Sequence, residues 1–281
     1  MKTQTCSKIN LGLNIVARRP DGYHDLQTVF YPVGLGDEIE ITENGGRGCQ
    51  LTVGGMPIDG DPAKNLVVRA WQLLDAQFRL PGVTIRLDKR VPMQAGMGGG
   101  SADAAYTLLM LNKMFALGLS VAQLQNLSAS LGADCPFFIE SRPAYAEGIG
   151  ERLTPVDLDL GTLWLAIVKP PVAVSTREAF SRVVPRQPLK NCRQVVAQPV
   201  ETWKDELHND FEDSIFPQYP VIGEVKNELY DMGALYAAMS GSGSAVFGLF
   251  PHRVAGLAER FTNAFTTVLP ALSRPSSLIT S

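Results

Sequence analysis

The segment that most constrains this chain is a run of glycines between a strand pattern and a helix pattern. In Val91–Ala105, VPMQAGMGGGSADAA, glycine fills four of five consecutive positions. The alternation of Val83, Ile85 and Leu87 predicts a strand before the run, and a helix is predicted over 101–115. Glycine lets backbone N–H groups approach a phosphate closely, and a helix N-terminus adds about +0.5 charge. The pattern favours a nucleotide-binding loop over a flexible connection, where ordering so many glycines would cost extra entropy.

The common nucleotide-binding motifs do not describe this loop. No lysine follows the glycines, so the loop is not a Walker A motif. The position three after Gly98 is Ser101, which breaks the dinucleotide-binding pattern G-x-G-x-x-G. The chain also contains neither the H-R-D nor the D-F-G motif of protein kinases.

Composition and charge exclude several classes of partner. The 281 residues carry a net charge of −3, which provides no electrostatic footprint for nucleic acid. No apolar run approaches the roughly 18 residues of a membrane span, and the first ten residues have no apolar signal segment. We expect a cytoplasmic protein that is a monomer or weak homodimer. The cysteines lack zinc-type spacing and are expected to be free thiols: Cys6, Cys49, Cys135 and Cys192.

The hydrophobic pattern predicts an α+β protein of two domains, 1–155 and 156–281. In the first, strands are predicted at 8–17, 27–31, 38–42, 50–53 and 83–87. Helices are predicted there at 64–78, 101–115 and 120–132, followed by an extended segment at 136–139. In the second, strands are predicted at 163–168, 235–239 and 245–250, and helices after 175, at 221–232 and at 253–267. Residues 184–202 are expected to be loop with a helix fragment, and the tail from Ser273 to be loosely ordered.

The glycine loop resembles that of a known family. Pro92-x-x-x-Gly96-Met97-Gly98-Gly99-Gly100-Ser101-Ala102 is similar to the P-x-x-x-G-L-G-S/G-S/G-S/A-A loop of the GHMP kinases, with methionine in place of the usual leucine. Three more blocks resemble the branch of this family that acts on a cytidine diphosphate derivative in isoprenoid synthesis. These blocks are Lys8–Leu11 with RPDGYH at 19–24, GADCPFF at 132–138 and SGSGSA at 240–245. Their order and spacing fit from residue 8 to about 267.

The resemblance implies a fold, two co-substrates and a set of site residues. The implied fold is a ribosomal-protein-S5-like N-terminal domain joined to a ferredoxin-like C-terminal domain. The implied substrates are ATP, used with a divalent cation that we expect to be Mg²⁺, and the cytidine diphosphate derivative. The resemblance assigns ATP binding to Pro92, Met93, Gln94, Ala95, Gly96, Met97, Gly98, Gly99, Gly100, Ser101 and Ala102. It assigns substrate binding to Asn10, Tyr23, His24, Lys89, Thr176 and Phe180.

Two charged residues are implied to be catalytic, although each also has a plainer interpretation. Asp134 lies between a helix end and an apolar segment, where a carboxylate is costly unless it is paired or used. By local pattern alone it caps a helix or forms a turn. Lys8 begins the first strand and by itself would be a solvated charge. The resemblance implies that Asp134 is the general base and that Lys8 lies beside it, supplying the lysine that the glycine loop lacks.

Other segments leave a structural alternative open. Tyr23 and His24 follow a turn and are also consistent with aromatic packing in a hairpin, whereas the resemblance implies contacts with cytosine. Residues 240–244 form either a hairpin turn or a second glycine-rich loop beside the first. Asn209 is interpreted as a helix cap. Homoserine kinase and mevalonate kinase remain as alternative functions, but we would expect them to lack the DGYH block. A non-catalytic protein of the same fold is a further alternative, although it would be expected to have lost Lys8 or Asp134, and both are present.

Overall fold

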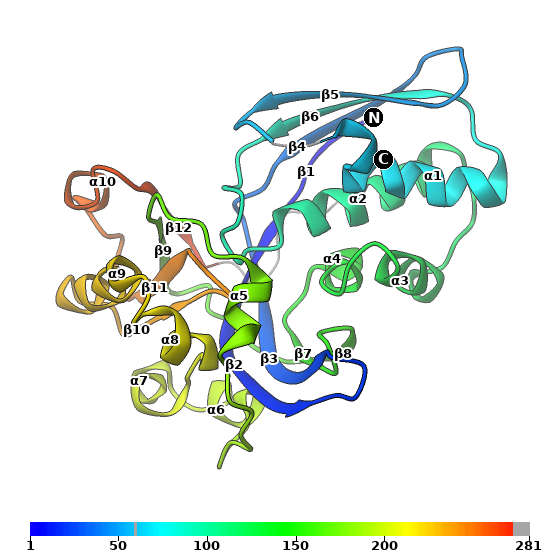
Figure 1. Cartoon of the computed structure of the whole chain (residues 1–281). Helices are drawn as coiled ribbons and strands as arrows, with labels where there is room; N and C mark the ends of the chain where they lie inside the picture. Colours follow the sequence, from blue (N-terminus) through cyan, green and yellow to red (C-terminus); the bar gives the residue numbers. More distant parts are fainter. Residues whose placement is uncertain (59–60, 272–281) are drawn as a thin grey trace.

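The computed structural model describes residues 1–58 and 61–271 (Figure 1). The strands are β1 (Lys2–Gln4), β2 (Ser7–Arg18), β3 (His24–Val33), β4 (Glu38–Glu43), β5 (Cys49–Gly55), β6 (Val83–Lys89), β7 (Ala144–Glu147), β8 (Arg152–Pro155), β9 (Trp164–Lys169), β10 (Tyr236–Met239), β11 (Val246–Phe250) and β12 (Phe265–Pro270). The α-helices are α1 (Leu66–Phe78), α2 (Gly99–Met114), α3 (Val121–Ala129), α4 (Cys135–Glu140), α5 (Thr176–Ser181), α6 (Cys192–Val196), α7 (Trp203–Glu206), α8 (Asp210–Ile215), α9 (Pro220–Asp231) and α10 (Leu257–Arg260). Two short 3₁₀ helices, η1 (Pro62–Lys64) and η2 (Val200–Thr202), complete the set.

The N-terminal part contains two four-stranded sheets. The first has the order β1-β4-β6-β5, in which only β5 and β6 run parallel, and α1 and α2 lie along one of its faces (Figure 1). The second is an antiparallel sheet of order β2-β3-β7-β8. Its last strand ends at Pro155, and the next strand belongs to another sheet. A domain boundary near residue 155 remains a prediction.

The C-terminal part has one antiparallel sheet of order β10-β11-β9-β12, with α9 packed on it. In chain order this is a strand, helices, two strands, a helix and a strand, with the first and third strands at the centre. This is the ferredoxin-like arrangement that the resemblance implied. Among the described residues, no helix combines the length and the apolar character needed to cross a membrane.

Most of the predicted elements are confirmed, and the differences follow from tertiary contacts. The predicted extended segment at 136–139 is wrong, because these residues lie in the buried helix α4. A run of four apolar residues has no period that separates a strand from a buried helix, and proline is tolerated in a first helical turn. The helix predicted at 253–267 is also wrong. Only 257–260 is helical, and Phe265–Pro270 is β12, rich in β-branched residues and paired with β9.

Helix starts differ from the predictions by a few residues. The segment predicted as one helix at 64–78 divides into η1 and α1, and the Asn65 side chain caps α1. Helix α2 begins at Gly99, with Gly98 rather than Ser101 or Asp103 at its cap. The predicted cap at Asn209 is confirmed, since its side chain accepts a hydrogen bond from Phe211 N–H. The tail from Ser273, predicted to be loose, lies outside the described residues.

Strand β2 and two loops connect the N-terminal and C-terminal parts. A shared apolar core contains Ile9 and Leu11 of β2 together with Leu165 and Phe247 of the third sheet. The glycine loop also meets the second glycine-rich loop. Backbone N–H groups of Ser244 and Ala245 donate to the carbonyls of Gln94 and Ala95 over 3.1 and 3.3 Å.

Gly96 lies at the point where the two loops touch. Its φ is +70°, and a Cβ atom there would lie 1.9 Å from the carbonyl oxygen of Ser240. Since Ser240 Oγ also donates to the Gly96 carbonyl over 3.0 Å, the two backbones are held at a distance that only glycine permits.

Replacement of Gly96 by alanine should therefore destabilise the protein. We expect Gly96→Ala to lower the free energy of unfolding by roughly 2 to 4 kcal/mol, because strain at positive φ adds to a backbone clash. Gly118→Ala is the matched control, since Gly118 has φ +71° and open space around its Cβ position. The control should lose only about 1 kcal/mol. Urea unfolding of both variants measures the two free energies of unfolding. Equal losses of free energy would show that the backbones of Gly96 and Ser240 are not in close contact.

Candidate active site

The glycine loop leads from the end of β6 into α2 and is held from two sides. Besides its contacts with the second glycine-rich loop, it meets β2, where Lys8 N–H donates to the Met97 carbonyl over 2.9 Å. Gly98, with φ +70°, is the N-terminal cap of the 16-residue helix α2. A Cβ on Gly100 would meet only Leu66 Cδ1, at 3.8 Å, so the first turn of the helix is open on that side. The loop therefore presents backbone N–H groups and a helix N-terminus to a cleft, as a phosphate site requires.

Lys8 points its ammonium group at this loop. Nζ donates to Asn10 Oδ1 over 2.6 Å and to the Gly96 carbonyl over 2.9 Å, and it lies 3.6 Å from Asp134 Oδ2. It also sits 5.0 Å from the centre of the Phe30 ring. Burial lowers the pKa of Lys8 below its ordinary value, although the negative charge of Asp134 opposes this shift. The plain interpretation of Lys8 as a solvated charge is wrong, because its side chain is only 5% exposed.

Asp134 reaches the same point from the start of α4. It occupies the cap position of that helix, yet its side chain makes no capping hydrogen bond. The carboxylate is instead 33% exposed in the cleft and faces Lys8. The Asp134 side chain therefore does not cap the helix, as the local pattern alone had suggested. The pair consists of a buried cation beside an accessible anion, an arrangement that can accept a proton and stabilise new negative charge.

Asn10 positions Lys8. Its side-chain oxygen accepts from Lys8, while its amide nitrogen donates to Thr28 Oγ1 over 3.0 Å. This network fixes which way the amide points. Asn10 lines the cleft but is 2% exposed, and its predicted substrate contact stays a prediction.

Lys89 has a different environment from the one predicted. Its ammonium forms ion pairs with Asp37 and with Asp103, the latter at 2.8 Å, and its side chain is 1% exposed. Burial alone would lower the pKa of Lys89, but the charges of Asp103 and Asp37 outweigh it and raise that pKa. Asp37 also accepts hydrogen bonds from the N–H groups of Arg90 and Val91 over 2.6 and 2.8 Å. The predicted contact of the Lys89 ammonium with substrate does not fit this geometry. The residue anchors the start of the glycine loop.

Aromatic residues gather at the other end of the cleft. The rings of His24 and Phe180 are stacked with centres 5.0 Å apart and planes inclined by 22°. Phe180 in turn packs edge-on against Phe211 at 4.8 Å. Tyr23 is 60% exposed at the rim, and Thr176 Oγ1 lies 3.4 Å from Ser242 Oγ of the second glycine-rich loop. Burial and the charge of Arg18 lower the pKa of His24, so this imidazole is neutral at pH 7.

A single cleft of about 1110 Å³ brings these groups together. Every predicted site residue lines it except Ala102, which is fully buried behind the loop. The cleft also has lining residues that the sequence analysis missed: Arg18, Thr28, Phe30, Leu66, Ile149, Arg177, Val183, Pro185 and Phe211. Thr28 and Phe30 lie on the strand predicted at 27–31, which follows the strand at 8–17 after a turn, and a hairpin pairing of the two would have placed them beside Asn10.

The cleft contains one acidic side chain among the described residues that line it, Asp134, and no described cluster of three or more His, Cys, Asp or Glu residues fits a metal ion. Mg²⁺ commonly binds through one or two protein oxygens plus substrate phosphates and water. Ser101, at the start of α2, places a hydroxyl at the loop as well. These residues fit a metal held mainly by a nucleotide.

Comparison with known proteins gives the same picture. The family profiles described as "GHMP kinases N terminal domain" and "GHMP kinases C terminal" match residues 65–142 and 191–267. A Bacteroides fragilis protein named 4-diphosphocytidyl-2-C-methyl-D-erythritol kinase is 54% identical over 246 residues, covering 87% of this chain and 90% of the relative.

Solved structures agree with these matches. A crystal structure of 4-(cytidine 5'-diphospho)-2C-methyl-D-erythritol kinase superposes with a TM-score of 0.77 at 33% identity, covering 96% of this chain and 99% of that one. Mevalonate kinase of Methanococcus jannaschii shares the fold, with a TM-score of 0.69 at 12% identity and 96% coverage of both chains. The chain therefore belongs to the GHMP kinase family and is a kinase that uses ATP as co-substrate to phosphorylate a small molecule.

Proposed function

We propose that this kinase transfers the γ-phosphoryl group of ATP to the 2-hydroxyl of 4-diphosphocytidyl-2-C-methyl-D-erythritol, giving the 2-phosphate and ADP. This would be a step of the non-mevalonate route to isoprenoids, carried out in the cytoplasm by a monomer or weak homodimer. The names of the similar proteins support this substrate. The observation that carries the proposal is the Lys8–Asp134 pair, which lies between the glycine loop and the aromatic end of one cleft.

The nucleotide would bind along the glycine loop. The N–H groups at the start of α2 would hold phosphate oxygens, and the loop cannot shift easily because β2 and the Ser240–Ser244 loop fix it. Ser101 is the loop side chain suited to a phosphate oxygen or to Mg²⁺, which would neutralise charge on the phosphates when bound.

The reacting hydroxyl would lie between Asp134 and the γ-phosphate. Asp134 accepts the hydroxyl proton as the oxygen bonds to phosphorus, and the bond from phosphorus to the β–γ bridging oxygen breaks to release ADP. The Lys8 ammonium, 3.6 Å from Asp134 Oδ2, stabilises negative charge on the reacting oxygens. Because Lys8 is buried and already bonded to Asn10 and Gly96, it needs no rearrangement to do so.

The cytidine group would bind at the aromatic end. A base requires a flat apolar surface and hydrogen-bonding groups at its edge. His24, neutral and stacked with Phe180, offers one nitrogen donor and one acceptor. The exposed Tyr23 stands at the rim, where it can close over the ring. Homoserine and mevalonate have no group that needs such a surface.

Turnover with a panel of alcohols tests the substrate. We expect ADP formation with 4-diphosphocytidyl-2-C-methyl-D-erythritol and at least about 100-fold lower kcat/KM with homoserine or mevalonate, because these lack the base that the aromatic end would hold. A coupled ADP assay and phosphorus NMR of the product measure rate and position. Turnover restricted to homoserine or mevalonate would contradict the proposed substrate, and ATP binding without any product would favour the non-catalytic alternative.

Substitution of Asp134 by asparagine tests the proposed base. The side chain keeps its shape but loses the ability to accept a proton, so kcat should fall about 10²- to 10⁴-fold. KM for ATP should stay within about twofold, since the loop N–H groups are unchanged. Asp231→Asn, an exposed acid at the end of α9 and outside the cleft, is the control and should keep wild-type rates. An Asp134→Asn rate within a few-fold of wild type would remove Asp134 from this role.

The pH dependence of kcat tests the charge on Lys8. A lysine is charged below its pKa. On the alkaline side, kcat should therefore stay at its maximum below the pKa of Lys8 and fall as pH rises through that pKa. Because burial lowers the pKa of Lys8, this decline should begin below the ordinary value of 10.5. In Lys8→Arg, whose guanidinium stays charged, any residual activity should lack the decline. An unchanged alkaline decline in Lys8→Arg would assign the titration to another group.

A further inference from the structure

The chain between α5 and α6 forms one wall of the aromatic end of the cleft. Residues 182–190, here called the strap, contain no helix or strand. The strap follows directly on α5, which carries Phe180. It lies after the N-terminal family match, 65–142, and before the C-terminal one, 191–267. The strap is therefore outside the portions that the general family profiles describe.

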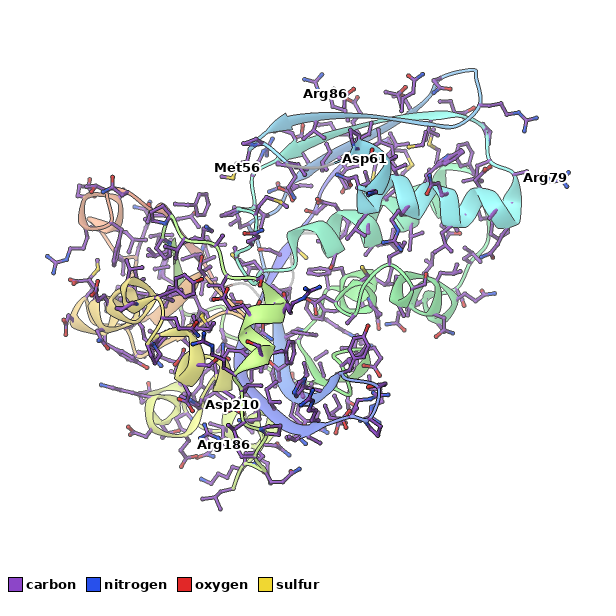
Figure 2. The ribbon with its side chains drawn as sticks, in the orientation of Figure 1. Met56, Asp61, Arg79, Arg86, Arg186 and Asp210 are labelled. Atoms are coloured by element: carbon purple, nitrogen blue, oxygen red, sulfur yellow. The ribbon has the colours of Figure 1, made fainter. Side chains whose placement is uncertain are left out.

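Side chains of the strap alternate between the cleft and solvent. Val183 and Pro185 are half-buried and line the cleft, and Val183 packs against the core that includes Phe211. Val184 between them is 78% exposed. Arg186 is on the outer side, where Figure 2 places it beside Asp210. The inner side of the strap thus adds an apolar surface next to the His24–Phe180 stack.

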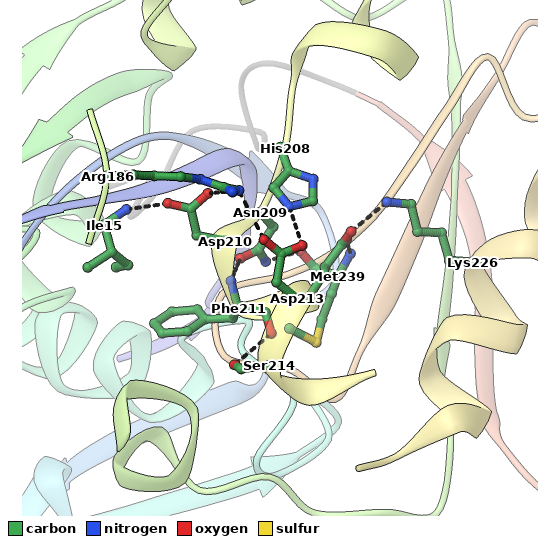
Figure 3. A network of polar contacts seen from close by, with 11 residues as sticks. Ile15, Arg186, His208, Asn209, Asp210, Phe211, Asp213, Ser214, Lys226 and Met239 are labelled. Atoms are coloured by element: carbon green, nitrogen blue, oxygen red, sulfur yellow. Dashed lines mark hydrogen bonds and ion pairs between the residues drawn. The ribbon is translucent and has the colours of Figure 1, made fainter. Parts of the chain in front are cut away.

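Arg186 makes three of the polar contacts that hold the strap, on the side of β2 and α8 (Figure 3). Its backbone N–H donates to the Ile15 carbonyl over 2.8 Å. Its Nη2 donates to Asp210 Oδ1 over 3.1 Å and to Asp213 Oδ2 over 3.0 Å. Gln187 adds a longer bond to the carbonyl of Val16, 3.2 Å. One residue therefore ties an otherwise irregular segment to both β2 and α8.

Asp210 bonds both to Arg186 of the strap and to the backbone of β2. Its carboxylate is 3% exposed, and its second oxygen accepts from Ile15 N–H over 2.8 Å. Both backbone groups of Ile15 are thus used, one by Asp210 and one by Arg186. Asp210 begins α8, whose next residue, Phe211, packs against Phe180. The helix that supports the aromatic stack also supplies the carboxylates that hold the strap.

Energetics indicate a local role for Arg186. The side chains of Arg186 and Asp213 are each 56% exposed, and an ion pair between exposed groups contributes little to overall stability. The Asp210 carboxylate is buried, but it keeps its hydrogen bond from a backbone N–H of β2 when Arg186 is lost. Between Val183 and Gln187 the polar contacts of the strap are those of Arg186 and Gln187, so loss of the Arg186 pairs should free this part of the strap rather than unfold the protein. A wall that is not held in place must be ordered when ligand binds, and this lowers affinity.

We propose that Arg186 is a positioning residue for the second substrate. By clamping the strap onto Asp210 and Asp213, it holds Val183 and Pro185 as the wall of the pocket for the cytidine group. This inference rests on the proposed function for the identity of that substrate. It predicts that loss of the clamp weakens binding of the cytidine substrate and leaves ATP binding and the chemical step largely unchanged.

Steady-state kinetics of Arg186→Gln tests the proposal. We expect KM for the cytidine substrate to rise roughly 3- to 10-fold, with KM for ATP and kcat within about twofold of wild type. The matched control is Lys190→Gln, which removes the exposed pair with Glu206 at the outer end of the strap and should change none of the three constants. Asp213→Asn, which keeps the Asp210 bond, should give an intermediate rise in KM.

Hydrogen exchange of the ligand-free enzyme provides a second readout. Amides of 182–190 should exchange faster in Arg186→Gln, while those of β2 and α2 keep wild-type rates. An unchanged KM for the cytidine substrate, or an equal rise in both KM values, would overturn the proposal. A wild-type enzyme that does not use the cytidine substrate would contradict the proposed function instead, so the two failures are distinguishable.

Discussion

The site depends on the contact between the Lys8 ammonium and the Gly96 carbonyl. This bond joins the first long strand to the glycine loop, and the same nitrogen faces Asp134 from a third segment. It forms only because Gly96 adopts positive φ under the Ser240 carbonyl, which turns the loop toward β2. A buried ammonium is costly without partners, and here Asn10, Gly96 and Asp134 supply them. One cation therefore links the glycine loop, Asp134 and strand β2 at a single point.

The buried ammonium of Lys89 supports the start of the glycine loop. Lys89 lies between Asp37 and Asp103, and these three side chains are almost completely buried. Burial raises the pKa of Asp103 to about 8, although the charge of Lys89 opposes the rise. The Asp37 carboxylate, which also binds the N–H groups of Arg90 and Val91, fixes the direction in which the chain leaves β6. The two lysines thus differ in position: Lys8 faces Asp134 in the cleft, and Lys89 holds the start of the glycine loop from the buried side.

Sequence pattern predicted secondary structure correctly where the structure depends on neighbouring residues. It failed where contacts with other elements determine the structure. The strand at 8–17 and the cap at Asn209 could be predicted because period and capping depend on neighbours in the chain, although the alternation did not show that both faces of this strand are buried. The helix at 135–140 could not, because its short apolar run has no period that separates a strand from a helix. The strand at 265–270 could not, because it is selected by pairing with β9, far away in sequence. The burial of Lys89 was missed for the same reason, since Asp37 is 52 residues away from it. The motif blocks placed Lys8 and Asp134 together because a resemblance carries tertiary information that periodicity lacks.

The site is divided between what the family profiles describe and what they do not. The glycine loop and Asp134 lie within 65–142, whereas Lys8, His24, Phe180 and Arg186 lie outside both matched ranges. Phosphate binding and proton removal need the same groups for any alcohol, so they fit the shared portion. A pocket for a base is needed for one kind of substrate, and in the proposed function the β2–β3 hairpin, α5 and the strap would form it. Strand β2 joins the two sets, with Lys8 near one end at the phosphates and Ile15 near the other under Arg186. A change of substrate in this fold would therefore involve the hairpin and the strap and leave the glycine loop unchanged.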